Sequence, residues 1–407
     1  MDKLLFLVHR LPYPPNKGDK IATHNMLKYF STRCRIFLGT FIDAEEDWQY
    51  LPMVEEMCAE TCIIGISPKT HKAKSVVKGL LSGEALSLPF YRNAQLQAWV
   101  DRVVAEEKPD AVLVYSGVMG LYLIDGKMPP NAGTLLNMED VDSEKWRAYG
   151  EQKTWPLSWL YRREADKLLA FETKASLQFD TTVFISKAEA DLFRSLAPEC
   201  ADRTTNRTQG VDSEYFDPSL SFEDPYPSDS RVLVFTGAMD YWPNIDAVTW
   251  FVNEVLPKVR KAVPDVLFCI VGMRPSPAVR KLGERPGVLV TGGVPDVRPF
   301  LSHAIAAVLP LRIARGIQNK VLEAMAMELP VLASSNAMTG IPDDEAYVVD
   351  TPEETATKAI ALLREGRQQK PAARQIILDQ FDWNANLRRL ETILTESSQK
   401  AQENASS

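Results

Sequence analysis

The chain has 407 residues, of which 45% are hydrophobic and 25% are charged, and its formal net charge is −8. Because single hydrophobic cores stop growing near about 250–300 residues, this length predicts two globular domains. The acidic balance argues against a nucleic-acid partner, which would require a basic face to meet phosphates. No run approaches the roughly 18 apolar residues of a spanning helix, and the first residues lack the apolar core of a secretory signal. We therefore expect a cytoplasmic protein.

The five cysteines are scattered along the chain. Cys58 and Cys62 are four residues apart, but no second Cys or His pair with the spacing of metal ligands accompanies them. We therefore expect buried, reduced thiols.

Short apolar runs alternate with amphipathic segments over the first half of the chain, which predicts right-handed βαβ units around a parallel sheet. These runs are rich in β-branched residues and have the length of buried strands. The expected strands are residues 4–8, 35–39, 61–66, 111–115, 133–137 and 181–185.

Residues 210–230 carry Pro, Ser, Asp and Gly without periodicity, which marks a linker. A second βα series follows it, and the tail beyond about residue 353 has a helical pattern with a break near Phe381. We place the domain boundaries at 1–212 and 213–380, with a helical tail at 381–407. The expected strands of the second series are residues 231–236, 266–271, 287–291, 304–309 and 329–333.

In open α/β sheets, ligands bind beyond the carboxyl ends of the strands. The strongest such signal is residues 310–334, in which a cationic loop leads through a glycine into a helix and then a strand. Cations and helix N-terminal amides form an anion site suited to a diphosphate. Glu323 falls one turn into the helix, where a carboxylate can accept two hydrogen bonds from a diol such as ribose. The loop residues concerned are Arg312, Arg315, Gly316 and Lys320.

The run VLEAMAMELPVLAS (residues 321–334) resembles the signature of glycosyltransferase family 4, whose members are retaining enzymes of the GT-B fold. Further segments are similar to motifs of that family. They are QGVDSEYF at 209–216, Ser186 at the end of FIS, GVPDV at 293–297 with Val294 at the donor's base, and Phe381–Trp383. YPPNKGDK, DVDSEKW and RGIQNKVLEAMAM together resemble the sugar transferases of bacterial exopolysaccharide and PEP-CTERM loci.

This resemblance implies an α/β GT-B architecture, with two doubly wound Rossmann-like domains facing across a cleft and a C-terminal helix crossing back. The N-terminal domain would bind the acceptor and the C-terminal domain the nucleotide sugar. It also implies a hexosyltransferase-type reaction without a metal or other cofactor, the nucleoside diphosphate sugar being the donor substrate.

Two features depart from the family pattern. The family's first glutamate lies eight residues before the second, and Arg315 occupies that position here. The family's Arg and Lys after the first strand of the second domain are also missing, because Gly237 is followed by AMDYWPN. We expect Arg312, Arg315 and Lys320 to supply the positive charge instead. Asp240 and Asn244 are candidates for holding the donor, although Asn244 could equally cap the next helix.

The loop at residues 9–20, HRLPYPPNKGDK, follows the first expected strand. Its prolines stiffen it, and Gly18 permits close backbone approach to a ligand. In the family this loop touches the acceptor and the donor phosphate, so Gly18 is a donor-binding candidate. The acceptor-binding candidates are His9, Asn16 and Lys17, although an ordinary strand-to-helix connection remains an alternative.

Glu139, Asp140 and Asp142 follow the strand GTLLN. An Asp-x-Asp triplet suggests a metal clamp, but the GT-B fold manages without a divalent ion. We therefore expect no metal, and we assign these carboxylates to contact with the acceptor hydroxyl or the sugar. Capping of the following segment is the competing interpretation.

Residues 69–81 and 155–163 combine basic residues with apolar or tryptophan side chains. Such segments suit either packing on the sheet or contact with the inner face of the plasma membrane. The function we predict is retaining transfer from a nucleoside diphosphate sugar to a saccharide or lipid-linked acceptor, in exopolysaccharide or cell-surface glycan synthesis. A sugar-nucleotide epimerase or hydrolase and a non-catalytic nucleotide-sugar-binding protein are the alternatives.

Overall fold

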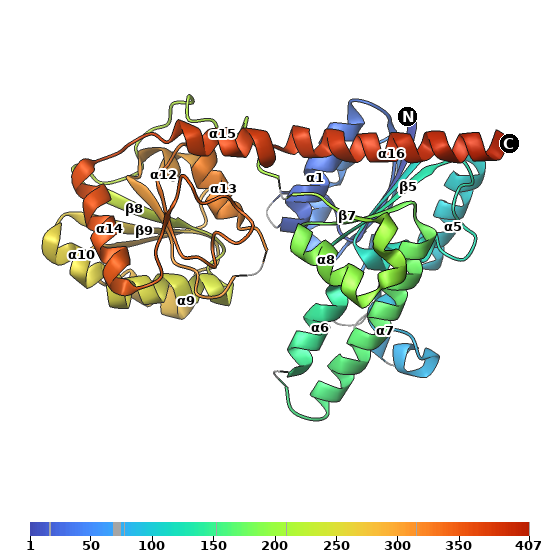
Figure 1. The fold of residues 1–407 in the computed structure, drawn as a ribbon, viewed down its shortest axis with the longest axis horizontal. Coiled ribbons are helices and arrows are strands. Elements are labelled where there is room, and N and C mark those ends of the chain that lie inside the picture. Colours follow the sequence, from blue (N-terminus) through green and yellow to red (C-terminus); the bar gives the residue numbers. More distant parts are fainter. Residues whose placement is uncertain are drawn as a thin grey trace. The chain divides into compact units, whose positions relative to one another are not determined.

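The computed structural model describes residues 1–15, 18–67, 75–76, 78–151, 153–208, 210–314 and 316–406. The chain forms two compact units (Figure 1). Unit 1 comprises Met1–Thr208 and Asn386–Ser407, and unit 2 comprises Gln209–Ala385. The sequence placed these boundaries at 212 and 380, so the last helix joins unit 1 a few residues later than expected.

Unit 1 is a seven-stranded, wholly parallel sheet in the order β3-β2-β1-β4-β5-β6-β7. Residues 4–8 of β1 are all fully buried, as expected of a strand covered on both faces. The strands are β1 (Lys3–Val8), β2 (Arg35–Ile42), β3 (Glu60–Gly65), β4 (Ala111–Tyr115), β5 (Gly133–Glu139), β6 (Thr181–Phe184) and β7 (Thr204–Asn206). Its main helices are α1 (Gly18–Ser31), α5 (Ala94–Arg102), α6 (Asp142–Glu151), α7 (Leu157–Gln178) and α8 (Lys187–Leu196).

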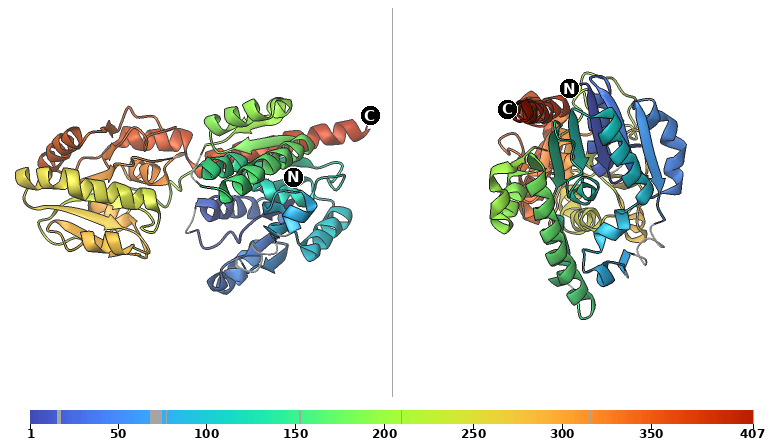
Figure 2. Two further views of the ribbon diagram at one scale, coloured as in Figure 1. Left: turned by 90° about the horizontal axis from the view of Figure 1, so that it is seen from below. Right: turned by 90° about the vertical axis from the view of Figure 1, so that its right-hand side faces the viewer.

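Helices α6 and α7 form a hairpin that projects beyond the sheet of unit 1 (Figures 1 and 2). The long C-terminal helix α16 (Trp383–Ser406) lies along the same unit from Asn386 on. It packs so tightly on the start of β5 that a Cβ at Gly133 would meet the carbonyl oxygen of Leu394 at 2.2 Å. Only glycine fits at that contact, which fixes the helix on the sheet.

Unit 2 is a six-stranded parallel sheet in the order β10-β9-β8-β11-β12-β13. The strands are β8 (Arg231–Thr236), β9 (Val266–Val271), β10 (Val288–Gly292), β11 (Ala306–Leu309), β12 (Val331–Ala333) and β13 (Tyr347–Val348). Its helices are α9 (Trp242–Trp250), α10 (Leu256–Ala262), α11 (Pro277–Leu282), α12 (Arg298–His303), α13 (Asn319–Ala326), α14 (Pro352–Glu365) and α15 (Pro371–Gln380). Its apolar core runs from Val211 to Phe381.

The doubly wound α/β architecture predicted from the sequence is confirmed, and each expected strand is present. The sequence pattern missed β7 and β13, which have only three and two residues. In each sheet the chain starts centrally, builds one side, and then returns to build the other. The topological switch therefore falls between β1 and β4 in unit 1 and between β8 and β11 in unit 2.

Among the described residues, no helix combines the length and apolar character needed to cross a membrane. All five cysteines are free thiols, of which Cys62, Cys200 and Cys269 are buried.

Candidate active site

In unit 2, the backbones after β8 and β9 approach each other closely. A Cβ at Gly272 would meet the carbonyl oxygen of Gly237 at 1.6 Å. A Cβ at Gly237 would meet the side-chain amide nitrogen of Asn244, Nδ2, at 2.8 Å. Both positions therefore require glycine. The result is a tight turn of backbone at the carboxyl end of β8, beside the switch point where doubly wound sheets bind ligands.

Lys320 and Asn244 meet at this turn. Asn244 is 3% exposed; its side chain donates to the carbonyl oxygen of Ala238 at 2.9 Å and accepts from the Lys320 ammonium at 2.9 Å. The ammonium also lies 5.6 Å from the centre of the Phe235 ring. Desolvation lowers the pKa of Lys320 to about 8, although Glu323 opposes that shift. A single cation is thus held at the end of β8.

The alternative in which Asn244 caps a helix is wrong. Tyr241 occupies the N-cap position of α9, without a side-chain capping bond, and Asn244 lies inside the first turn. Its amide is used instead to join Lys320 to the loop after β8.

Glu323 lies on the same helix as Lys320, in its second turn. The side chain is partly buried, and its carboxylate has no hydrogen-bond partner within the described part of the chain. Desolvation raises the pKa of Glu323 to about 7, while the charge of Lys320 acts in the opposite direction. A desolvated carboxylate without a partner is costly, and it provides two strong acceptors for a ligand with hydroxyl groups.

The other donor-binding candidates of unit 2 have different surroundings. Arg312 is exposed and forms a two-pronged ion pair with Asp246, with 2.9 Å between Nε and Oδ2, so that its charge is largely compensated. Asp240 pairs with Arg274 at 3.2 Å. Gly316 has a φ of 65°, which glycine favours, just before α13, and Val294 is half-buried after β10. Arg315 lies outside the described residues.

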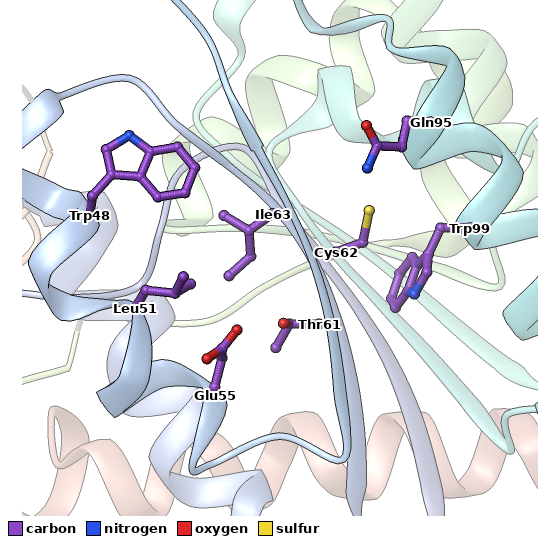
Figure 3. Close-up of a pocket in the computed structure, with 8 residues that line it drawn as sticks. All are labelled: Trp48, Leu51, Glu55, Thr61, Cys62, Ile63, Gln95 and Trp99. Atoms are coloured by element: carbon purple, nitrogen blue, oxygen red, sulfur yellow. The ribbon is translucent and has the colours of Figure 1, made fainter.

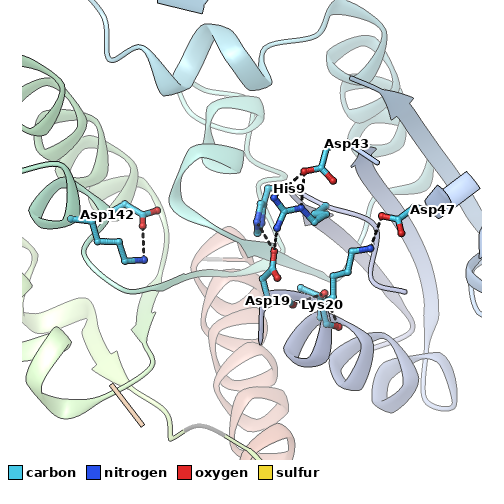
Figure 4. A network of polar contacts seen from close by, with 9 residues as sticks. His9, Asp19, Lys20, Asp43, Asp47 and Asp142 are labelled. Atoms are coloured by element: carbon cyan, nitrogen blue, oxygen red, sulfur yellow. Dashed lines mark hydrogen bonds and ion pairs between the residues drawn. The ribbon is translucent and has the colours of Figure 1, made fainter. Parts of the chain in front are cut away.

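In unit 1, the loop after β1 carries a network of charged groups (Figure 4). Asp19 accepts from His9 Nε2 at 3.3 Å and from Arg10, whose guanidinium also binds Asp43 at 2.9 Å. Hydrogen bonds from His9 and the charge of Arg10 hold the pKa of Asp19 well below its usual range, despite desolvation. The His9 ring stacks on Tyr115 at the end of β4, with 6.0 Å between centroids. His9 therefore lies at the β1/β4 switch point.

Gly18 begins α1, and a Cβ there would meet no atom within 4 Å. Among the described residues, therefore, none crowds this end of the helix. Asn16 and Lys17, the acceptor-binding candidates of the same loop, lie outside the described residues.

Glu139 ends β5 and adopts a φ of 68°, a conformation that residues other than glycine rarely take. Its carboxylate binds the guanidinium of Arg207, which is only 1% exposed, and accepts from the Asn137 amide at 2.9 Å. The sequence did not single out Arg207. No sequence signal pointed to it, because the strand β7 that precedes it has only three residues, Thr204–Asn206.

Asp140 and Asp142 both bind Lys145, at 2.7 and 3.0 Å. The two carboxylates raise the pKa of Lys145 above its ordinary value, against desolvation. Among the residues that the structure describes, no three His, Cys, Asp or Glu side chains are grouped to hold a metal ion. The ammonium of Lys145 takes the place between the two aspartates that a metal clamp would use.

Ser186, which resembles the family's interdomain serine, accepts a hydrogen bond from the backbone amide of Glu189 at 3.2 Å. It is the N-cap of α8, so it stabilises the start of that helix.

We expect Arg207→Gln to lower the free energy of unfolding by about 3 kcal/mol or more, because it leaves the Glu139 carboxylate without its buried counter-charge. Arg231→Gln is the control, since its pair with Asp265 is about half exposed and should change stability by less than about 1 kcal/mol. Denaturant unfolding of both variants measures the difference. Equal effects would show that the buried pair does not stabilise unit 1.

Residues 230–365, which include the Lys320–Asn244 site, match the family model described as Glycosyl transferases group 1. Solved structures of glycosyltransferases share the fold over nearly the whole chain. Sucrose-phosphate synthase from Thermosynechococcus elongatus has a TM-score of 0.67 and 15% identity, over 100% of both chains. A glycosyltransferase from Rickettsia africae has a TM-score of 0.64 and 13% identity, over 97% of this chain and 98% of that one.

A third similar structure is Anabaena HepE in complex with UDP, with a TM-score of 0.63 and 14% identity, over 97% of this chain and 100% of that chain. No curated protein matches the sequence significantly. The resemblance to the group 1 glycosyltransferases is thus confirmed by the match over residues 230–365, and the fold is that of GT-B enzymes. The match supports glycosyl transfer as the activity.

Proposed function

We propose that this chain transfers a glycosyl unit, with retention, from a nucleoside diphosphate sugar to a saccharide or lipid-linked acceptor in cell-surface glycan synthesis. Unit 2 binds the donor and unit 1 the acceptor. The observation that carries the proposal is the Lys320–Asn244 contact beside the desolvated Glu323, within the segment that matches the group 1 model. One cation and one diol-binding carboxylate are the groups that a nucleoside diphosphate requires.

The negative charge of the leaving diphosphate is stabilised by Lys320 and by the first amides of α13. Charge that develops in the transition state is best met by groups already in position. The hydrogen bond to Asn244 holds the Lys320 ammonium in position, so this side chain does not need to be reoriented during the reaction. Arg312 contributes less, because Asp246 already compensates its charge.

In unit 1, the acceptor is bound near His9 and Glu139, at the carboxyl ends of β1 and β5. The Glu139 carboxylate binds the buried Arg207 and is a candidate to contact the acceptor hydroxyl. Asp140 and Asp142 both form ion pairs with Lys145, so their role is to position the Lys145 ammonium or the backbone of this loop.

Glu323→Gln tests the donor site. We expect it to weaken UDP binding about ten-fold or more, because a charge-assisted hydrogen bond contributes roughly 1.5–3 kcal/mol. The 2′-deoxy nucleotide should bind the wild type more weakly than UDP does, and the variant should discriminate much less. Calorimetric titration measures both ligands. Glu254→Gln, an exposed carboxylate of the same unit, is the control. If both proteins discriminate equally against the deoxy nucleotide, Glu323 does not bind the ribose.

We also propose that transfer needs no metal ion, because Lys320 supplies positive charge at the donor and Lys145 occupies the position between Asp140 and Asp142. Turnover should therefore survive exhaustive chelation and remain unchanged on addition of magnesium or manganese. The same assay without acceptor tests for an epimerase or hydrolase, which would consume the donor alone. Activity lost to the chelator and restored by the metal would contradict the proposal.

We further propose that the tip of the α6–α7 hairpin contacts an anionic membrane surface, where a lipid-linked acceptor would be found. Trp155 is 80% exposed and Trp159 55%, so packing does not account for these side chains. Lys153 and Arg162 are exposed and have no carboxylate partner within the described part of the chain. Exposed tryptophans with unpaired cations suit the interface of a bilayer. Of the other candidate segment, residues 69–74 and 77 lie outside the described residues.

Replacing Lys153 and Arg162 together by Gln should weaken binding to phosphatidylglycerol vesicles about thirty-fold, since each cation near an anionic surface contributes about 1 kcal/mol. Sedimentation with vesicles measures the binding. Exchange of the exposed Trp242 of unit 2 for Ala is the control and should have no effect. Equal sedimentation of wild type and double variant would place the membrane contact elsewhere or exclude it.

A further inference from the structure

A pocket of about 370 Å³ lies at the open edge of the sheet of unit 1, around strand β3 (Figure 3). Trp48 of the turn η1 (Glu45–Tyr50) and α2 (Leu51–Glu55) line it on one face of this edge strand, and Gln95 and Trp99 of α5 line it on the other face (Figure 3). Its size falls within the range of small-molecule sites. None of the candidate site residues of unit 1 lines it.

Both tryptophans of the pocket are held in place. The Trp48 ring lies against Gly65, where a Cβ would come 3.0 Å from a ring carbon. The neighbouring Asp47 ties this turn to α1 through a buried ion pair with Lys20 at 2.5 Å (Figure 4). Trp99 donates its indole N–H to Glu60 at 2.6 Å. Aromatic rings fixed in this way offer flat apolar surfaces at little entropic cost.

Three polar side chains line the same pocket and have no hydrogen-bond partner within the described part of the chain: Glu55, Thr61 and Gln95. They offer a carboxylate, a hydroxyl and an amide, which together can both donate and accept hydrogen bonds. Flat aromatic surface combined with such groups matches a sugar ring, which has an apolar face and a rim of hydroxyl groups.

The charge around the pocket restricts the ligand further. Glu55 is its charged lining residue, and Glu45, Glu46 and Glu56 are exposed on the same turn and helix. None of the described residues that line the pocket is a lysine or an arginine. Like charges repel, so phosphate groups, uronic acids and anionic lipids are disfavoured here.

We propose that this pocket is a second saccharide-binding site, which takes a neutral sugar unit of the acceptor at a distance from the reacting hydroxyl. The choice of a saccharide rests on the proposed function. Occupation of a second site would raise the affinity for long acceptors over short ones, because the second contact is intramolecular.

Saturation-transfer NMR on the full chain tests the proposal, with three hexasaccharides as probes: α-1,4-glucan, β-1,4-glucan and polygalacturonate. At least one neutral probe should bind. Trp48→Ala and Glu55→Gln should each weaken it about ten-fold, through lost ring contact and a lost charge-assisted hydrogen bond. The Tyr149→Ala variant, which removes an exposed aromatic side chain of the same unit, should bind like the wild type.

The proposal is wrong if neither neutral probe binds, if both pocket variants bind like the wild type, or if polygalacturonate binds as tightly as a neutral probe. Trp48 is 40% exposed and Glu55 is exposed, so both variants should fold, which thermal unfolding verifies. UDP is titrated in parallel. If the wild type does not bind UDP, the proposed function is wrong. If the wild type and both pocket variants bind UDP equally, and the variants also bind the neutral probe as the wild type does, only the second site is wrong.

Discussion

The hydrogen bond from Lys320 to Asn244 joins the first turns of two helices, α9 and α13, which follow the central strands β8 and β11 of unit 2. The contact forms only because Gly237 has no side chain, since a Cβ there would lie 2.8 Å from the Asn244 amide and 3.3 Å from a Lys320 carbon. A half-buried cation is thereby fixed where doubly wound sheets bind ligands. Glu323, whose carboxylate has no hydrogen-bond partner among the described residues, follows on the same helix.

This arrangement accounts for one of the two departures from the family pattern. The cations expected after β8 are missing, but Lys320 reaches the same strand end from the helix after β11. In unit 1 a comparable constraint acts on Glu139, which has a positive φ and whose carboxylate binds the buried Arg207. In both units a charged group is held by a neighbour on another strand or helix, and the buried Arg207–Glu139 ion pair is costly to break.

The sequence predicted the architecture well because buried parallel strands are apolar on both faces, as in residues 4–8 and 231–236. It also singled out Lys320 and Glu323 as donor-binding candidates, because the loop and helix that carry them are continuous in sequence, and that role stays a prediction. It failed where the partner is distant: Asp246 compensates Arg312, and Arg207 binds Glu139 across 68 positions. The pocket beside Trp48 and Trp99 was equally invisible, because its walls come from segments that only the folded sheet brings together.

The central claim is that Lys320, rather than Arg312, meets the diphosphate. Titration of UDP into the wild type, Lys320→Met and Arg312→Met at a series of pH values tests it most directly. A charged Lys320 and an ionised Glu323 coexist best between about pH 7 and about pH 8, because Glu323 loses its charge below its pKa and Lys320 above its own. Wild-type affinity should peak there, and Lys320→Met should bind about ten-fold more weakly without the alkaline decline. The account would be contradicted if the Lys320→Met variant bound UDP as tightly as the wild type while Arg312→Met lost much of its affinity for UDP.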